Sequence, residues 1–163
     1  MMRVRLVALA LILAAALGAV SCKEDGLPVT DYYPHHCELA LPLPHVYAEM
    51  QSDKFDAAFT DGRAVVGMVR ISFAASQSGG VPTTLDPMQF AEYYMLLSER
   101  EETVKQTGDV PYYSYEENGY FYTYAFYRSR YAYFTVLYTC IAELRADYEN
   151  DFLEYASGAY FTA

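Results

Sequence analysis

Runs that are rich in apolar and aromatic residues recur along the chain, bounded by polar turn residues, and this pattern predicts strands. The runs at 54–60 and 63–73 predict two strands joined at Asp61-Gly62, a dipeptide typical of two-residue hairpin turns. A shorter strand is expected over 38–43, where Pro42 and Pro44 interrupt the pattern. The N-terminal half of the folded region is therefore predicted to begin with a strand and a hairpin.

Three further runs, at 110–117, 120–127 and 131–141, predict an antiparallel meander. A two-residue turn at Asn118-Gly119 would place Tyr115 opposite Tyr122 and Tyr113 opposite Tyr124. A three-residue turn at 128–130 would place Tyr122 opposite Val136 and Tyr124 opposite Phe134. This register gathers one face of the meander: Tyr113, Tyr115, Tyr120, Tyr122, Tyr124, Phe126, Phe134, Val136, Tyr138 and Cys140.

Two segments have the period of a helix. Asp86-Pro87 begins the first, because Asp86 suits the N-cap, Pro87 suits the first turn, and Gln89 completes a capping box. We expect this helix to continue far enough for Glu101 and Lys105 to form an i,i+4 pair on its last turns. The second helix is expected over 143–156, with one apolar face made by Leu144, Tyr148, Phe152 and Tyr155.

The order of strand, hairpin, helix, meander and helix predicts an α+β domain, with two main helices packed on an antiparallel sheet. Several local patterns accompany this order: Leu43-Pro44, Asp-Pro-Met-Gln-Phe-Ala at 86–91, and Ala-Ser-Gly-Ala-Tyr-Phe at 156–161. Together they resemble the PsbP-like family, which includes an extrinsic photosystem II protein, bacterial lipoproteins and the fold of a Ran-binding nuclear import factor. The resemblance implies a PsbP-like fold but no catalytic residues, because the family is functionally diverse.

The first 22 residues have the layout of an export signal. Two arginines precede the apolar run 6–17, which is too short to cross a bilayer, and small residues lead into Cys22. This end resembles the lipobox of bacterial lipoproteins, which implies that Cys22 carries the lipid and that residues 1–21 are removed. Ala19-Val20-Ser21 also fits ordinary signal cleavage. We expect residues 22–36 to be a tether and 37–163 a single domain.

Three cysteines are present, and lipidation of Cys22 would leave Cys37 and Cys140 as a pair. Exported proteins commonly form disulfides, so the count predicts a Cys37–Cys140 bridge, with two separately buried free thiols as the alternative. All three histidines, His35, His36 and His45, fall within eleven residues. Their clustering is the strongest metal-binding feature of the sequence, but the spacing matches no structural zinc pattern, and the sequence favours a polar tether that leads into a strand.

Tyrosine is concentrated in the predicted meander, where ten of the 18 fall between Tyr112 and Tyr138. Cross-strand aromatic pairs are typical of a sheet core. Because buried hydroxyls need hydrogen-bond partners, Tyr113, Tyr115, Tyr122 and Tyr124 are also candidate ligand-binding residues for a peptide, a glycan or another ligand.

The charge balance limits the classes of partner. Twenty-one acidic residues against 11 basic ones give a formal net charge of −10, which falls to −12 once Arg3 and Arg5 are removed with the signal. This excludes a clustered basic footprint for nucleic acid and implies that membrane attachment depends on the lipid. No enzyme motif is present, and we expect no catalysis and no cofactor. The sequence therefore predicts a lipid-anchored extracytoplasmic protein at the cell envelope, which binds or scaffolds another protein. The alternative is a protein that binds a small ligand or a metal through the tyrosines or the histidines.

Overall fold

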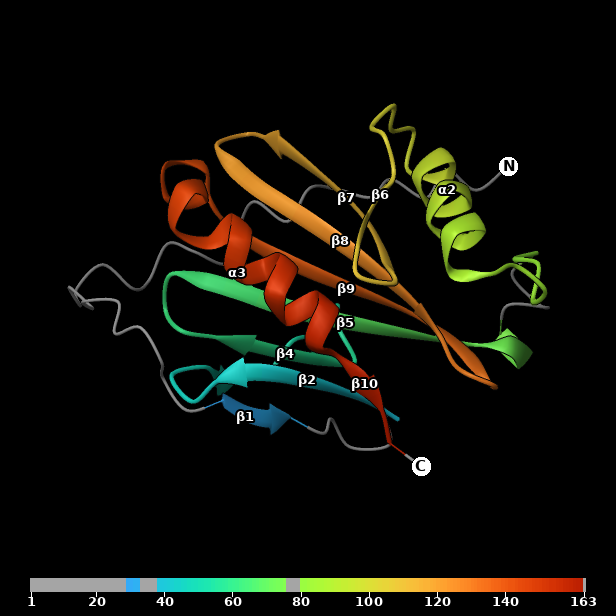
Figure 1. Cartoon of the computed structure of the whole chain (residues 1–163), viewed down its shortest axis with the longest axis horizontal. Helices are drawn as coiled ribbons and strands as arrows, with labels where there is room; N and C mark the ends of the chain where they lie inside the picture. Colours follow the sequence, from blue (N-terminus) through green and yellow to red (C-terminus); the bar gives the residue numbers. More distant parts are fainter. Residues whose placement is uncertain (1–28, 33–37, 76–79, 163) are drawn as a thin grey trace.

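The computed structural model describes residues 29–32, 38–75 and 80–162, and it contains two antiparallel sheets (Figure 1). Seven strands form the main sheet in the order β3-β4-β5-β9-β8-β7-β6. Their bounds are β3 Ala48–Glu49, β4 Ala57–Thr60, β5 Ala64–Ser72, β6 Lys105–Thr107, β7 Val110–Glu117, β8 Tyr120–Arg128 and β9 Ala132–Ile141. The predicted α+β class with an antiparallel sheet is confirmed.

A three-stranded sheet lies beside the main one, in the order β1-β2-β10. It consists of β1 Val29–Tyr32, β2 Leu39–Pro44 and β10 Tyr160–Phe161. The predicted N-terminal strand therefore exists as β2, but it pairs with the end of the chain and not with the meander. Part of the expected tether is also folded, because β1 pairs with β2 from Val29 opposite Pro44 to Tyr32 opposite Leu41. Val29, Thr30 and Tyr32 are residue types that favour strands.

One face of the main sheet packs against α3 and β2. A short 3₁₀ helix, η1 Ala142–Leu144, leads into α3 Arg145–Gly158. Tyr148 and Phe152 of α3 are buried against Phe121 and Tyr138, and the leucines of β2 complete the same core. Leu144 and Tyr155 pack against its margin, so the predicted apolar face of the last helix is confirmed.

The opposite face of the sheet holds α2 Pro87–Leu97, which contacts β7 and β8. Phe90 stacks on Tyr133, with ring centroids 4.1 Å apart. Tyr133 and Tyr138 are separated by an odd number of positions on β9, so they face opposite sides of the sheet. The two helices therefore cover opposite faces, and the molecule has three layers.

The predicted capping box of α2 is present, because Gln89 N–H donates to Asp86 and the Gln89 side chain accepts from Asp86 N–H. The helix ends earlier than expected. Glu99 has a φ of 55°, and Arg100 N–H donates back to the Met95 carbonyl, which closes the helix at its C-terminus. Lys105 lies in β6, so the expected Glu101–Lys105 pair on a helical turn was wrong.

The predicted register was correct at one turn of the meander and wrong at the other. Tyr115 lies opposite Tyr122 and Tyr113 opposite Tyr124, as expected. Across the second turn, however, Tyr122 lies opposite Thr139 and Tyr124 opposite Leu137. The pairing is displaced by three residues, an odd number, so Phe134, Val136, Tyr138 and Cys140 face α3 and not the tyrosines.

Candidate functional site

The predicted tyrosines form a stack on the α2 side of the sheet, which we call the tyrosine ladder (Tyr113, Tyr115, Tyr122 and Tyr124). The ring centroids of Tyr113 and Tyr124 are 5.3 Å apart, and those of Tyr115 and Tyr122 are 5.0 Å apart. Tyr113 is 1% exposed and Tyr122 is buried, while the other two are half-buried. The rings pack on one another and, through Tyr94, on α2.

Arg100 closes the outer end of the ladder. Its guanidinium carbon lies 3.9 Å from the centroid of the Tyr115 ring, and its Nη2 donates to Glu117 Oε2 at 2.6 Å. Burial raises the pKa of Tyr113 and Tyr124 well above the ordinary value. Burial also raises the pKa of Tyr115, although Arg100 opposes that shift. The ladder therefore holds neutral phenols in a packed stack, and ligand binding by these tyrosines stays a prediction.

Only one of the three predicted metal ligands, His45, lies within the described residues. His45 is exposed in the turn between β2 and β3, while His35 and His36 lie outside the described residues, as does Cys22. Over 29–32, 38–75 and 80–162, no three histidine, cysteine or acidic side chains are grouped as metal ligands. None of the helices in these ranges is long and apolar enough to cross a membrane.

Cys140 is a free, buried thiol at the end of β9. Its expected partner, Cys37, lies outside the described residues, so the bridge between them stays a prediction. Burial raises the pKa of the Cys140 thiol to about 12.

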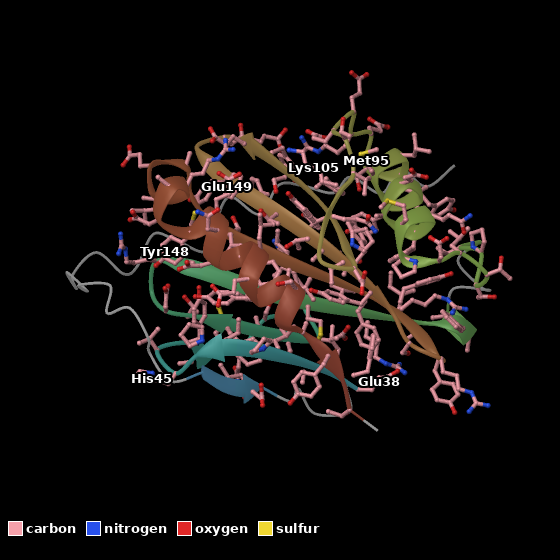
Figure 2. The ribbon with its side chains drawn as sticks, viewed as in Figure 1. Glu38, His45, Met95, Lys105, Tyr148 and Glu149 are labelled. Carbon is pink, nitrogen blue, oxygen red and sulfur yellow. The ribbon has the colours of Figure 1, made fainter. Side chains whose placement is uncertain are left out.

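A surface that the sequence did not predict lies at the turn between β8 and β9. This turn depression has a volume of about 780 Å³. It is lined by Glu38, Arg128, Ser129, Arg130, Tyr131, Phe161 and Thr162. Tyr131 is 61% exposed and Phe161 is 40% exposed, so two aromatic rings face solvent at one place. Figure 2 shows Glu38 at this end of the molecule, far from His45 and Tyr148.

The Ser129 side chain determines the shape of the turn. Its Oγ accepts hydrogen bonds from the backbone N–H groups of Tyr131 and Ala132, both at 3.1 Å. Ser129 N–H also donates to the Ala132 carbonyl. These bonds produce a four-residue loop, 129–132, in place of the expected three-residue turn, and they account for the displaced register of β9.

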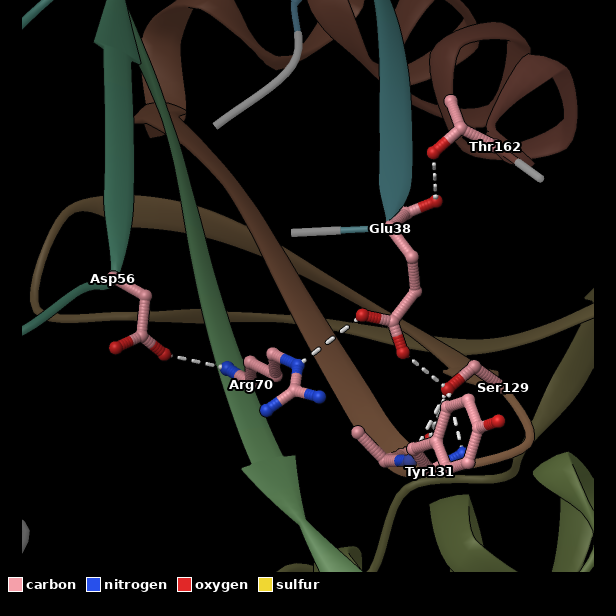
Figure 3. Close-up of polar contacts among 7 residues, drawn as sticks. Glu38, Asp56, Arg70, Ser129, Tyr131 and Thr162 are labelled. Carbon is pink, nitrogen blue, oxygen red and sulfur yellow. Dashed lines mark hydrogen bonds and ion pairs between the residues drawn. The ribbon is translucent and has the colours of Figure 1, made fainter. Parts of the chain in front are cut away.

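Glu38 connects this turn to two other segments, as Figure 3 shows. The Ser129 hydroxyl donates to Glu38 Oε1 at 2.6 Å, and Arg70 Nε donates to Glu38 Oε2 at 3.4 Å. The Glu38 carbonyl accepts from Thr162 N–H at 2.8 Å. Burial alone would raise the pKa of Glu38, but the Ser129 hydroxyl, its own backbone and Arg70 together lower it. The carboxylate is therefore ionised and engaged at neutral pH, and it holds the turn against β5 and the C-terminal segment.

A larger depression, of about 950 Å³, runs along residues 49–58. Three of its lining side chains, Glu49, Asp53 and Asp56, are acidic, and its aromatic ring belongs to Phe55. That ring covers Gly67, where an added Cβ would lie 2.6 Å from it. Because this ring is already used in packing, the larger depression lacks the exposed aromatic surface of the turn depression.

The sequence contained one signal for the turn depression. Arg128 and Arg130 are separated by a single residue and followed by Tyr131, in a segment that the sequence predicts to be a turn. Phe161, Thr162 and Glu38 could not be assigned to the same place, since they lie at opposite ends of the folded chain and meet only through the pairing of β2 with β10.

No protein-family model matches the chain, and no curated protein sequence matches it. Among solved structures, the cyanobacterial PsbP protein CyanoP from Synechocystis sp. PCC 6803 has a TM-score of 0.53 at 11% identity, covering 88% of this chain and 98% of that one. LpqN, a protein involved in cell envelope biogenesis of Mycobacterium tuberculosis, has a TM-score of 0.46 at 10% identity, covering 85% and 88%. The likeness to CyanoP establishes a PsbP-like fold, as the local patterns predicted.

Proposed function

We propose that this chain is an extracytoplasmic lipoprotein, anchored through Cys22, which acts as a non-catalytic protein-binding module and contacts its partner through the turn depression. The observation that carries the proposal is the pairing of an exposed aromatic ring with an arginine, Tyr131 beside Arg130, at the mouth of the depression. Their separation is 5.5 Å from the guanidinium carbon to the ring centroid.

The form of the depression supports a protein partner over a small molecule. Tyrosine and arginine dominate the binding energy of protein interfaces, whereas small ligands are enclosed over most of their surface. Tyr131 and Phe161 are both open to solvent, so they offer contact area without enclosure. In the tyrosine ladder, in contrast, the rings pack against one another.

A photo-crosslinking amino acid tests the proposed contact. Benzoylphenylalanine at position 131, in the full-length chain expressed in its native cells, is expected to give one discrete adduct of higher mass after irradiation. The matched control is the same residue at Glu143, which is also exposed but lies in η1. The proposed contact fails if position 131 gives no adduct, or if both positions give the same adducts.

The lipid anchor has its own test. Metabolic labelling with an alkyne-bearing fatty acid is expected to label the wild-type chain and to leave Cys22→Ala unlabelled. Equal labelling of Cys22→Ala, or no labelling of either chain, would contradict the anchor while leaving the contact at Tyr131 open to the crosslinking test.

A further inference from the structure

Arginines in the described part of the chain differ in their partners. Four of them form ion pairs with carboxylates: Arg63 with Asp147, Arg70 with Glu38, Arg100 with Glu117, and Arg145 with Glu116 and Glu149. Within the same residues, Arg128 and Arg130 form no such ion pair, and both line the turn depression. In a chain of net charge −10, two arginines that line one depression therefore have no carboxylate partner among the described residues.

Both arginines contact uncharged groups, so these contacts leave their positive charges unpaired. Arg128 Nη2 donates to the Thr83 carbonyl at 3.2 Å, and its guanidinium carbon lies 5.2 Å from the Phe73 ring centroid. Arg130 lies beside the Tyr131 ring. Glu38 is the one carboxylate of the lining, and Arg70 already pairs with it. The depression is left with an excess of positive charge, which favours an anionic ligand.

The neighbouring backbone offers a second kind of contact. Within the described residues, β10 pairs with β2 on one side and is an edge strand on the other. Thr162 N–H donates to the Glu38 carbonyl, so Tyr160 opposite Ala40 is the next hydrogen-bonded pair. Because hydrogen-bonded positions alternate along an antiparallel ladder, the N–H and C=O of Phe161 point away from β2. An extended peptide could pair with this edge.

We propose that the turn depression binds an extended acidic peptide segment of the partner, with its backbone along the open edge of β10 and its carboxylates on Arg128 and Arg130. This rests on the proposed function, because it names the chemistry of the partner at the same site. Charge alone would also suit an anionic membrane. The edge strand favours the peptide, since backbone pairing needs N–H and C=O groups in an extended chain.

The charge requirement is tested with a defined probe. A fluorescein-labelled peptide of alternating aspartate and valine, and the same peptide with asparagine for aspartate, are titrated with the full-length chain in detergent, and anisotropy is measured. We expect the aspartate peptide to bind more tightly than the asparagine peptide. Arg128→Gln with Arg130→Gln should weaken its binding by about tenfold or more. The matched control, Lys54→Gln with Lys105→Gln, removes the same charge from exposed lysines elsewhere and should change binding less than about twofold.

The backbone requirement is tested at Phe161. Phe161→Pro removes both the ring and the N–H, whereas Phe161→Ala removes only the ring. Proline is tolerated in edge strands, so the fold should survive, and circular dichroism checks this. We expect Phe161→Pro to bind the aspartate peptide about fivefold more weakly than Phe161→Ala. Equal binding by the two variants would overturn the pairing with β10.

The remaining outcomes separate this inference from the proposed function. Equal binding of the aspartate and asparagine peptides, or equal loss in the lysine control, would overturn the acidic peptide. A third outcome would also overturn it: the chain sediments with phosphatidylglycerol vesicles, the two arginine substitutions abolish this sedimentation, and neither peptide binds. In each case, a crosslinked adduct at position 131 would still support the protein-binding function. Absence of that adduct would overturn the function itself, even if the peptide bound.

Discussion

The tyrosine ladder lies on β7 and β8 and the turn depression lies at the end of β8, yet the two regions present aromatic rings in opposite ways. In the ladder, Tyr113 is 1% exposed and its ring lies 5.3 Å from that of Tyr124. In the depression, Tyr131 is 61% exposed and its ring lies beside Arg130. The four rings of the ladder are mostly buried, whereas both rings of the depression, Tyr131 and Phe161, are exposed to solvent.

The number of tyrosines in a region therefore does not locate a binding surface. The ladder tyrosines of β7 and β8 lie opposite one another and pack against α2, so their rings are used in packing. Tyr131 lies in the turn between β8 and β9, and its ring stays exposed to solvent.

The largest contrast is in thiol reactivity. In a chain with Cys22→Ser and Cys37→Ser, Cys140 is buried with its pKa raised to about 12, whereas Tyr131→Cys would place a thiol in the exposed loop. At pH 8 the thiolate fractions of the two thiols should differ by about a thousandfold, so iodoacetamide should label position 131 far faster. Mass spectrometry of timed samples measures both rates. Similar rates in the folded protein would refute the contrast, and similar rates in urea are the control.

The next contrast is in stability. Tyr113→Ala removes a ring that touches the ladder and α2, and it should lower the free energy of unfolding by about 3 kcal/mol. Tyr131→Ala should change it by less than about 0.5 kcal/mol. Urea unfolding followed by circular dichroism measures both values, and Tyr113→Phe separates the hydroxyl from the ring. If both alanine variants lost similar stability, the ladder would not be the packed region described above.

Alkaline pH should act on the buried tyrosines. Burial raises the pKa of Tyr113, Tyr127 and Tyr138 above the unfolded value. The folded state therefore keeps protons that the unfolded chain loses, so the stability is fully present below about pH 10 and is lost as the pH rises further. Each of the three should contribute a loss of about 1 kcal/mol by about pH 11. Urea midpoints across this range measure the loss, and Tyr131→Phe should follow the wild-type curve. A midpoint independent of pH would refute the raised pKa values.

The smallest effect concerns the loop that shapes the depression. Ser129→Ala removes the acceptor for Tyr131 N–H and Ala132 N–H, and the donor to Glu38. We expect a loss of about 1 kcal/mol and faster hydrogen exchange at those two amides. Ser157→Ala is the control, because Ser157 bonds only the local Glu154 carbonyl at the end of α3. Unchanged exchange at Tyr131 and Ala132 would show that Ser129 does not hold the loop.

Much of the fold could be predicted because the relevant signals are local. The capping box at Asp86 and Gln89 lies within one turn, and the apolar face of α3 repeats every three or four residues. The Asn118-Gly119 turn determined the pairing of β7 with β8 because both residues adopt positive φ there. The termination of α2 at Leu97 was missed, because the left-handed conformation of Glu99 has no strong sequence marker.

The candidate site depended on contacts between distant segments. The longer strands, the two main helices, the tyrosines of β7 and β8, and the arginines at the turn could be predicted, since each follows from the pattern or spacing of nearby residues. The short strands β1, β3, β6 and β10 could not. Only the tertiary structure decided the register of β9, because the Ser129 hydroxyl selects a four-residue loop and an odd displacement reverses the faces. It also decided that Glu38 and Phe161 meet this loop, because β2 and β10 pair across more than a hundred residues of chain.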